Sequence, residues 1–589
     1  MTSTPLALTT RPVMLAASML WVLVILVWRP VVDAPFVHDD LVQIVDREQQ
    51  VDAPWRSWSA LSAGQRPLVQ LTLGVNHHLG GLDSRGYHAL NIALHGVAAA
   101  LCMVVLWTAA CRLLERGVLA AQPTWIFAVC MAASALWAVH PVQTASVSYV
   151  IQRAELLVGI GALLAVWGLV RASRAGASVR WQALAVVGCA AAILSKPSAV
   201  TVPALVLAVD AAICTGSLAA SLRERWMMHA ACWVSLLLLL PLGVIDSLLD
   251  DGGVARSAGF SVPGVHPLTY AWAELGAFGI YAGELILPAL MSIDHGWTVI
   301  ETAPWPRIVG AAAVLSMLAT LVVGLAQGAW WWILGALPLI MLLPTSSIVP
   351  LRDPVADHRL YLALLGPVLA FVALAAVPTS RAGSGWRRLG SLVVIAAIVT
   401  AVVTTITRNE AWCSPSRLWD PVIAMRPDDA TALMNRSLSR LAAGDDDGAR
   451  LDAAAAFDAR PSDGSAAAML GVLEVRAGHP EEALDWLLRA ESLGTKTASV
   501  RGAKGDALRA LGRYAEAAEA YEKASRRSPS SERLALLLGL SRAESGNMEA
   551  ASMVLERLAA DARDPAVMER ARAWLKEFPG DAGSGATAP

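Results

Sequence analysis

The stretch PVMLAASMLWVLVILVWR at residues 12–29 decides the class of this protein. An apolar run of this length can cross a bilayer as a helix, and it lacks the small-residue site at which a signal peptide is cut. We therefore interpret it as the first membrane anchor. Hydrophobic residues make up 56% of the 589 residues and charged residues only 16%, against about 25% charged in an average soluble domain. The chain is therefore predicted to be an integral membrane protein.

Ten further apolar runs of spanning length follow the first one. They lie near residues 86–111, 124–140, 154–171, 181–195, 198–216, 228–248, 307–327, 330–350, 358–378 and 388–407. The stretch 265–289 is ambiguous because it contains Glu274 and Glu284, so it is a span, a re-entrant piece or an interfacial helix. The runs predict an all-α fold in which residues 1–411 form a polytopic membrane helix bundle.

Arginines in the connecting loops mark one face of this bundle as cytoplasmic. They are Arg112, Arg116, Arg171, Arg174, Arg180, Arg223, Arg225, Arg381, Arg387 and Arg388. All these arginine-rich loops lie on the same face only if the stretch 265–289 does not cross the membrane. That arrangement gives eleven crossings, a cytoplasmic N-terminus and an external position for everything after residue 408.

Reactive side chains gather on the opposite, external face. The first external loop, residues 30–85, contains His38-Asp39-Asp40 and Arg66. Later external segments add further polar residues: His140, Arg153, Glu155, Lys196, His358 and Arg359. Charged groups at membrane depth are costly and usually line a cavity or meet a partner. Their concentration on one side therefore predicts a single functional site.

Glycosyl transfer from a polyprenyl-phosphate sugar would use such a set of residues. A carboxylate must orient or deprotonate the acceptor hydroxyl, and Asp39 and Asp40 are the candidates. Cations must stand near the lipid phosphate, where negative charge grows as the leaving group departs. The candidates for this task are Arg153, Lys196, His358 and Arg359. Because adjacent carboxylates repel, one of the two aspartates is expected to have a raised pKa or to share a metal.

Each candidate also has a plainer interpretation. An isolated pair of aspartates in a loop is ordinarily solvated, and Arg66 could serve only to position that loop. His140-Pro141 could simply end a helix. Arg153 and Glu155 could anchor a helix at the membrane interface. The run Trp330-Trp331-Trp332 fits an interfacial aromatic belt better than a sugar platform.

A different composition begins after residue 412 and repeats with a period of 34 residues. Two columns show the period: Gly444, Gly478, Gly512 and Gly546, and Ala449, Ala483, Ala517 and Ala551. Small residues let paired helices pack closely, and glycine suits the turn between them. The stretch GRYAEAAEAYEKA at 512–524 resembles the tetratricopeptide (TPR) motif.

We therefore predict a linker at 412–429 and four TPR repeats at 430–565, followed by a capping helix and flexible tail at 566–589. TPR solenoids present a concave groove to peptides or partners. The plainer alternative is that the array only packs on its own membrane body or dimerises it.

The external motifs together resemble the transmembrane and TPR-repeat-containing O-mannosyltransferase family, which is placed with the C-type glycosyltransferases (GT-C). The resemblance rests on FVHDD at 36–40, RPL at 66–68, Asn76, GYHALN at 86–91, HPVQT at 140–144, RAELL at 153–157 and DHRLYL at 357–362. It covers nearly the whole chain, and it implies an acidic catalytic motif in the first external loop. The sequence departs from the family at three positions. The family often has an aromatic residue at the position of His38, a glutamate after the lysine at the position of Pro197, and a second histidine at the position of Gln143.

Taken with the resemblance, the sequence predicts a GT-C-like membrane glycosyltransferase. It would move a sugar such as mannose from a polyprenyl-phosphate donor to hydroxyls of exported proteins. Asp39 and Asp40 are predicted to be catalytic. The predicted substrate-binding residues are Arg66, His140, Arg153, Glu155, Lys196, His358 and Arg359. The TPR array would bind the acceptor or a partner protein.

The expected location is a bacterial inner membrane with the TPR region outside the cytoplasm. No cofactor and no metal are expected, because many relatives that use phosphate-linked monosaccharides are metal-independent. No basic stretch suggests nucleic acid. Two alternatives stay open. A polysaccharide ligase would have its large external loop late in the chain, and a non-catalytic TPR scaffold would not need ionisable motifs at membrane depth.

Overall fold

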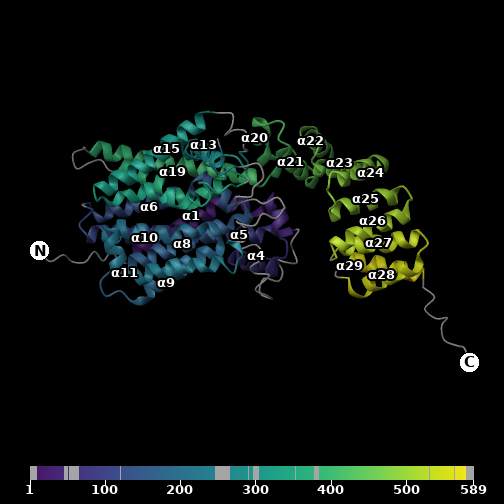
Figure 1. Cartoon of the computed structure of the whole chain (residues 1–589), viewed down its shortest axis with the longest axis horizontal. Helices are drawn as coiled ribbons and strands as arrows, with labels where there is room; N and C mark the ends of the chain where they lie inside the picture. Colours follow the sequence, from purple (N-terminus) through teal and green to yellow (C-terminus); the bar gives the residue numbers. More distant parts are fainter. Residues whose placement is uncertain are drawn as a thin grey trace, which may run out of the picture. The chain divides into compact units, whose positions relative to one another are not determined.

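The computed structural model contains helices and no β-strand in the residues it describes, which are 10–45, 51, 66–119, 121–245, 266–288, 291–295, 304–351, 353–376, 384–529, 531–562 and 564–578. The predicted all-α class is therefore confirmed. The chain divides into two compact units, residues 1–418 and 419–589 (Figure 1). The boundary falls inside helix α20 (Pro415–Met425), within the segment predicted as a linker.

Unit 1 is a multi-pass membrane bundle. Six of its described segments are long and apolar enough to cross a bilayer: Arg11–Asp33, Ser84–Glu115, Val150–Ala172, Pro197–Thr215, Pro304–Ala326 and Arg388–Trp412. Two helix pairs meet the same test together but are bent at a short break. They are Pro123–Val139 with Pro141–Val147, bent by 46°, and Asp357–Ala363 with Leu365–Leu374, bent by 56°.

Most main helices of unit 1 overlap the predicted apolar runs, whereas α4 (Pro67–Gly80) lies in the predicted first external loop. The other main helices are α1 (Thr10–Trp28), α5 (Ser84–Glu115), α6 (Pro123–Val139), α7 (Thr144–Val147), α8 (Arg153–Ala172), α9 (Val179–Ser195), α10 (Val202–Val209), α11 (Leu218–Val234), α13 (Pro267–Ile286), α15 (Pro304–Ala326), α16 (Ile333–Leu342), α17 (Leu360–Ala363), α18 (Leu365–Ala376) and α19 (Ser384–Trp412). Short 3₁₀ helices join several of them, including η3 (Pro141–Gln143), η4 (Val150–Gln152), η5 (Pro197–Thr201), η9 (Trp330–Trp332) and η10 (Asp357–Arg359).

Three predicted runs do not appear as full-length spans. The runs 181–195 and 330–350 correspond to shorter apolar helices, and the run 228–248 falls on the end of α11 and a following 3₁₀ turn. Helix α13, which covers the ambiguous stretch 265–289, is not among the candidate spans. The six to eight candidate spans leave the predicted number of eleven crossings, and the orientation derived from it, as predictions.

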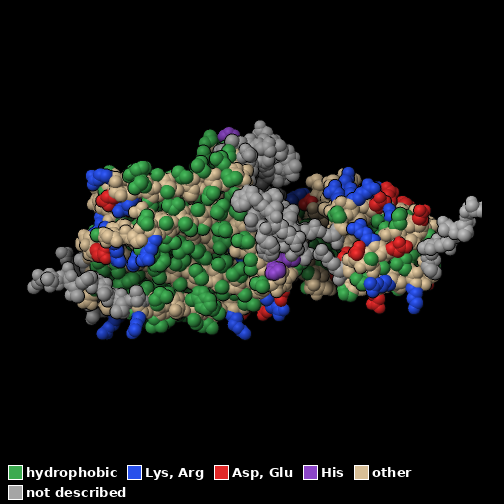
Figure 2. Space-filling model, turned by 90° about the horizontal axis from the view of Figure 1, so that it is seen from below, with side chains coloured by type: hydrophobic (Ala, Val, Ile, Leu, Met, Phe, Trp, Pro, Cys, Tyr) green, Lys and Arg blue, Asp and Glu red, His purple; other side chains and the backbone are tan. Residues whose placement is uncertain are grey.

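The outer surface of unit 1 is apolar, as contact with lipid requires. Leu15 of α1, Leu315 of α15 and Leu392 of α19 expose 62–65% of their surface. Figure 2 shows hydrophobic side chains over most of the visible face of this unit. A continuous apolar surface of this extent would drive aggregation in water, so this surface is the part of the chain that a bilayer covers.

Glycines allow two helix pairs of unit 1 to approach at backbone distance. A Cβ on Gly310 of α15 would lie 1.6 Å from the carbonyl oxygen of Leu275 on α13. A Cβ on Gly161 of α8 would lie 2.8 Å from the backbone nitrogen of Ala192 on α9. Membrane helices associate through such close packing because lipid provides no hydrophobic force between them. Helix α13 is therefore packed directly against a candidate span.

Unit 2 is a solenoid of paired helices. The pairs are α21 (Ala430–Ala442) with α22 (Asp446–Ala459), α23 (Gly464–Ala477) with α24 (Pro480–Ser492), α25 (Ala498–Ala510) with α26 (Tyr514–Arg527), and α27 (Glu532–Glu544) with α28 (Met548–Asp561); α29 (Pro565–Glu577) follows them. Beyond α20, the described residues of this unit thus form four helix pairs and one further helix. Gly444, Gly478, Gly512 and Gly546 each turn within a pair with φ between 72° and 87°, which favours glycine.

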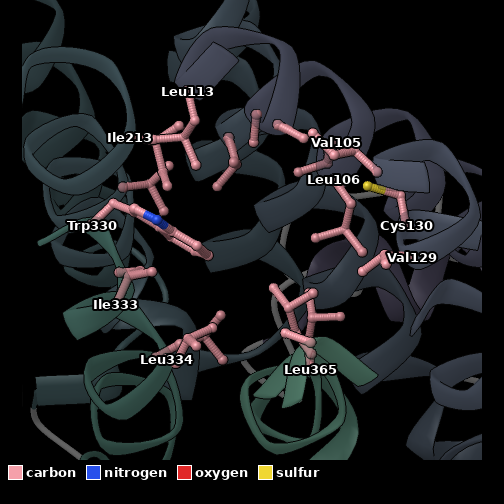
Figure 3. A pocket seen from close by; sticks show the side chains of 18 of the residues that line it. Val105, Leu106, Leu113, Val129, Cys130, Ile213, Trp330, Ile333, Leu334 and Leu365 are labelled. Atoms are coloured by element: carbon pink, nitrogen blue, oxygen red, sulfur yellow. The ribbon is translucent and has the colours of Figure 1, made fainter. Parts of the chain in front are cut away.

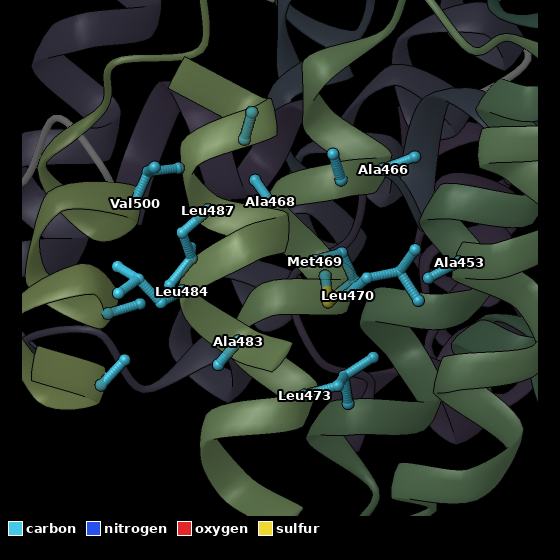
Figure 4. Packing of buried hydrophobic residues seen from close by; sticks show 14 of the residues in the cluster. Ala453, Ala466, Ala468, Met469, Leu470, Leu473, Ala483, Leu484, Leu487 and Val500 are labelled. Atoms are coloured by element: carbon cyan, nitrogen blue, oxygen red, sulfur yellow. The ribbon is translucent and has the colours of Figure 1, made fainter. Parts of the chain in front are cut away.

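The second repeating column lies in the core of the solenoid. Ala449, Ala483, Ala517 and Ala551 are fully buried, so a larger side chain at any of them would separate the helices. Leu470 and Leu487 pack with Ala449, Ala483 and Ala517 into one cluster (Figure 4). The 34-residue period therefore reports which residues face the core.

Candidate active site

The two adjacent aspartates of the first loop have different surroundings. Asp40 is fully buried, and its Oδ1 accepts a hydrogen bond of 2.8 Å from the backbone nitrogen of Ile151. The side chain of Asp39 is 53% exposed and lies 3.9 Å from the His38 imidazole. His38 has a φ of 49°, which no other non-glycine residue among those described shares above zero. The turn at His38 thus sends one carboxylate inward and leaves the other accessible.

Burial has a large effect on the inward carboxylate. It raises the pKa of Asp40 from 3.8 to about 7, against the backbone hydrogen bonds from Ile151 and Val37, which favour the charged form. The neighbouring charge of Asp39 adds a smaller rise. The expectation that one aspartate has a raised pKa therefore applies to Asp40, and burial rather than repulsion is its main cause.

Glu155 and Lys196 form a buried ion pair. Lys196 is the residue between α9 and η5, and its extended backbone fits the position before Pro197. Its Nζ lies 2.5 Å from Oε1 of Glu155, in the first turn of α8, and each side chain is only 11% exposed. Lys196 therefore has an acidic partner even though Pro197 stands where the family has a glutamate.

Arg66 connects this ion pair with the accessible aspartate. It immediately precedes α4, whose first residue is Pro67, a favoured helix start. Burial lowers the pKa of Arg66, while the negative charges of Glu155 and Asp39 oppose that shift. Arg66 is therefore within electrostatic reach of both carboxylates, so the first loop and α8 contribute to the same site.

Arg359 completes the cationic group from the 3₁₀ helix η10, and the preceding residue, His358, lies beside it. Arg359 donates hydrogen bonds to the carbonyl oxygens of Pro354 (2.7 Å) and Asp353 (2.5 Å), which fixes its guanidinium. It lines a small polar pocket together with Glu155. Burial lowers the pKa of Lys196, and Arg66 and Arg359 lower it further, while Glu155 opposes the shift. His358 is subject to the charges of the same three cations.

Two predicted substrate-binding residues, Arg153 and His140, make structural contacts in unit 1. Arg153 is fully buried, and it donates to Oδ1 of Asn91 (2.7 Å) and to the carbonyl oxygen of Tyr87 (3.0 Å), which ties α8 to α5. His140 accepts a hydrogen bond of 3.3 Å from the backbone nitrogen of Val142 and so caps η3. These contacts favour the plainer interpretation of His140, and contact of either residue with substrate stays a prediction.

Sequence reasoning did not single out Tyr149, which holds the accessible aspartate in place. Its hydroxyl accepts a hydrogen bond of 2.9 Å from the backbone nitrogen of Asp39. Its ring lies 6.3 Å from that of His38. In the sequence, Tyr149 is an aromatic residue between the motifs at 140–144 and 153–157, and this position was the one feature that could have pointed to it.

A second ionisable cluster lies beside this site and includes Asp357, the neighbour of His358. Nε2 of His295 is 2.9 Å from Oε1 of Glu284 and 3.0 Å from Oδ1 of Asp357. Burial alone would lower the pKa of His295, but the charge and hydrogen bond of Asp357, supported by Glu284, raise it to about 10. Arg408 approaches the other oxygen of Asp357 at 3.5 Å. Glu284 lies in the ambiguous stretch 265–289, and His295 belongs to none of the sequence motifs.

A large apolar cavity of about 860 Å³ opens between helices of unit 1. Its lining comes from α5, α6, α10, α16 and α18, and Figure 3 shows Leu106, Ile213, Trp330 and Leu365 facing it. Leu362 lines both this cavity and the small polar pocket of Glu155 and Arg359. An apolar chain in the cavity would therefore end close to the cationic group.

Comparison with known proteins finds a TPR match and similarity to protein O-mannosyl-transferases. The family model for the tetratricopeptide repeat matches residues 508–575. The chain is 32% identical over 198 residues to Protein O-mannosyl-transferase TMTC4 of Homo sapiens, a match that covers 29% of this chain and 26% of that protein. It is 26% identical over 399 residues to Protein O-mannosyl-transferase TMTC4 of Mus musculus, covering 62% of this chain and 48% of that protein.

Among solved structures, the crystal structure of YrrB, a TPR protein with an unusual peptide-binding site, is 20% identical with a TM-score of 0.25, covering 30% of this chain and 87% of that chain. The chain spans less than half the length of the curated relatives named above. The predicted presence of TPR repeats and the predicted resemblance to the TPR-containing O-mannosyltransferases are both confirmed.

Proposed function

Because the chain resembles the TPR-containing protein O-mannosyl-transferases, we propose that it is a membrane glycosyltransferase that moves a sugar from a polyprenyl-phosphate donor to a hydroxyl of an exported protein. One observation carries this proposal. An accessible carboxylate, Asp39, stands within electrostatic reach of a buried cationic group that includes Arg66 and Lys196. Acceptor activation and leaving-group stabilisation require these two kinds of side chain close together.

The cationic group would hold the donor phosphate. Arg66, Lys196 and Arg359 bring three cationic side chains to this site. They lie near the carboxylates of Glu155, Asp39 and Glu274, and a donor phosphate would add an anionic partner to them. Phosphate contacts with arginine and lysine are charge-assisted and strengthen as charge develops on the leaving oxygen. The polyprenyl chain would occupy the apolar cavity, whose lining residue Leu362 it would pass to reach the cations.

Asp39 would act on the acceptor hydroxyl, while Asp40 supports the loop. The buried Asp40 accepts backbone hydrogen bonds and has no open side toward solvent. Asp39 is exposed, and its backbone is fixed by Tyr149. The proposal therefore assigns the base to Asp39 and a positioning role to Asp40.

The remaining parts of the proposal concern the acceptor and the membrane. We place the chain in a bacterial inner membrane with the reacting side facing outward. The TPR unit would bind the acceptor or a partner protein, as TPR solenoids commonly bind peptides. The donor is used without a metal at the reacting phosphate, because the cationic side chains supply the charge.

The decisive experiment is transfer in membrane vesicles that contain the full chain. Labelled mannose on polyprenyl phosphate is supplied as donor, and exported proteins are examined by mass spectrometry for a hexose on serine or threonine. Asp39→Asn should abolish transfer because the amide cannot accept the hydroxyl proton. Asp33→Asn, a change at an exposed aspartate of the same loop, is the matched control. Equal transfer by Asp39→Asn and the control would refute the assignment.

A further inference from the structure

We propose that Glu284, His295 and Asp357 form a binding site for a first-row divalent transition-metal ion, Mn²⁺ or Zn²⁺. The three residues come from three segments, namely the end of α13, residues 291–295 and η10. Their ligand atoms lie within 4.8 Å of one another, and all three residues are buried. The observations that support this assignment do not depend on the glycosyl transfer proposed above.

Two carboxylate oxygens lie close to Nε2 of His295, more than its single proton can serve. Nε2 of His295 lies 2.9 Å from a Glu284 oxygen and 3.0 Å from an Asp357 oxygen. It carries at most one proton, and its hydrogen bond goes to Asp357. A metal ion has no such limit, since it bonds to the nitrogen and to both carboxylates at once.

The carboxyl group of Glu284 is buried without well-placed hydrogen-bond donors among the described residues. Its side chain is fully buried, and no described residue donates a hydrogen bond of good geometry to either of its oxygens. Burying a carboxylate without donors is costly, and buried charges are ordinarily paired or bound to a metal. The approach of His295 to Oε1 places the unsatisfied carboxylate against the other two ligands.

Charge and surroundings favour a cation in this position. Two carboxylates and a neutral imidazole would neutralise a divalent ion. Arg408 lies on the far oxygen of Asp357 at 3.5 Å, and it also donates to the carbonyl oxygen of Met291 (3.1 Å) and to Oγ1 of Thr144 (2.9 Å). An outer partner that orients a ligand carboxylate in this way is usual in metal sites.

The ligand set indicates which metals fit. Imidazole suits the later transition metals and carboxylates suit harder ions, so a mixed set with one histidine favours Mn²⁺ or Zn²⁺ over Mg²⁺ and Ca²⁺. In a six-coordinate ion such as Mn²⁺, bonds of about 2.1 Å that meet at right angles separate neighbouring ligand atoms by about 3.0 Å. The two observed separations, 2.9 and 3.0 Å, are those of hydrogen bonds and also fit that spacing.

A bound ion would fix the start of η10. Asp357 directly precedes His358 and Arg359, and the preceding residue, Ala356, donates its backbone N–H to the hydroxyl of Tyr281 (3.1 Å) on α13. A metal between α13 and Asp357 would hold the same two segments together by a second link. The site is therefore a positioning element for the cationic group.

Metal binding by the purified full chain in lipid nanodiscs tests the proposal. The protein is stripped with EDTA and titrated with MnCl₂ while free Mn²⁺ is followed by electron paramagnetic resonance. We expect about one tightly bound ion per chain, displaced by ZnCl₂ but not by MgCl₂. His295→Ala and the conservative Asp357→Asn should each weaken binding at least about tenfold, since each removes a ligand.

His479→Ala is the matched control, because His479 belongs to a second His and acidic group, with Glu474 and Glu482, that is largely exposed in unit 2. This control should bind Mn²⁺ like the natural chain. Absence of bound Mn²⁺ and Zn²⁺ in the natural chain would overturn the proposal and leave an ion-pair cluster with a protonated histidine. Loss of the ion in His479→Ala alone would overturn it as well. A thermal shift with ZnCl₂ on the natural chain gives a second readout should the variants fail to fold.

Discussion

Replacing Asp40 by asparagine separates the two aspartates of the first loop in one experiment. The folded protein holds the pKa of Asp40 at about 7 instead of 3.8 because the carboxyl is buried. A pKa difference of about 3 corresponds to about 4 kcal/mol of stability lost when the buried group must ionise. Asparagine has nearly the same shape and cannot ionise, so it avoids that cost.

The sign of the pH dependence follows from the direction of the shift. The unfolded chain releases the Asp40 proton above pH 3.8, whereas the folded chain retains it until about pH 7. Stability is therefore highest at low pH and falls as the pH rises through the folded pKa. Between about pH 5.5 and pH 7 the natural protein should lose about 2 kcal/mol, and above pH 7 the loss levels off.

The asparagine variant pays a smaller cost of its own. Oδ1 can still accept from Ile151 at 2.8 Å, but the amide group would face the backbone nitrogen of Val37, which now donates to Oδ2 at 3.4 Å. The lost long hydrogen bond costs about 1 kcal/mol. The net expectation at pH 8 is a variant more stable by about 3 kcal/mol, with no advantage at pH 4.

The assay is thermal denaturation of the full chain in detergent at several pH values, followed by sugar transfer in vesicles. Asp40→Asn should denature at a higher temperature than the natural protein at pH 8 and retain much of its transfer activity, while Asp33→Asn should change neither. An Asp40→Asn variant with an unchanged pH profile would refute the account of burial. A stable Asp40→Asn variant without any transfer would refute the assignment of the base to Asp39 alone.

Three further outcomes are expected. Lys196→Met should lower donor turnover at least about tenfold and destabilise the protein by about 3 kcal/mol, because Glu155 is left buried without its partner. The double variant with Glu155→Gln should recover stability, measured by denaturation, but not turnover, measured by donor hydrolysis. Leu106→Trp should raise KM for long polyprenyl donors and leave KM for short-chain donors unchanged, since Leu106 lines the apolar cavity. Gly505→Val should destabilise unit 2 by about 1–3 kcal/mol, because a Cβ there would lie 2.6 Å from Cε1 of Tyr521. Calorimetry that separates the unfolding transitions of the two units should show the transition of unit 1 unchanged.

Local signals made most of the fold predictable. A membrane span is recognised from its own apolar length, and a TPR repeat from its own period, so neither requires knowledge of distant contacts. The first apolar run and the glycine column at Gly444 and Gly478 illustrate the two cases, since each lies where it was predicted. The shorter helices α9 and α16 were harder to classify, because composition alone does not tell a full span from a buried helix.

The site was predictable as a group of residues but not as a set of pairs. Lys196 seemed to lack an acidic partner because the next residue is Pro197, yet Glu155, 41 positions earlier, supplies one through the packing of α8 and α9. Likewise the contacts of Arg153 could not be predicted from its position in the sequence: Nε and Nη2 donate to α5, while Nη1 is buried and has no hydrogen-bond partner among the described residues. Hydropathy places such residues at the correct depth without showing which neighbouring helix they face.

The two bent spans explain why polar residues can be held at this depth. Backbone groups released by a broken helix must be satisfied within the protein, because lipid offers no partner. The carbonyl oxygen of Tyr361, near the second break, accepts hydrogen bonds from Trp137 Nε1 (2.9 Å) and Gln143 Nε2 (3.3 Å), which flank the first break. At the first break, the carbonyl oxygen of Val139 accepts one from Thr405 (2.7 Å) on α19.

The second break is therefore satisfied partly by residues of the first, and the first partly by α19, so these segments are joined by hydrogen bonds. Asp357 and Arg359 lie in η10, at the start of one bent span, and η10 is joined to the other span by the hydrogen bond from Ser146 to the carbonyl oxygen of His358 (3.3 Å). Straight helices at these positions would expose the charged groups of η10 to lipid, at a cost of several kcal/mol for each. The bends are thus the structural condition for a charged site in this membrane unit, and Gln143, where the family has a histidine, serves that condition with its amide.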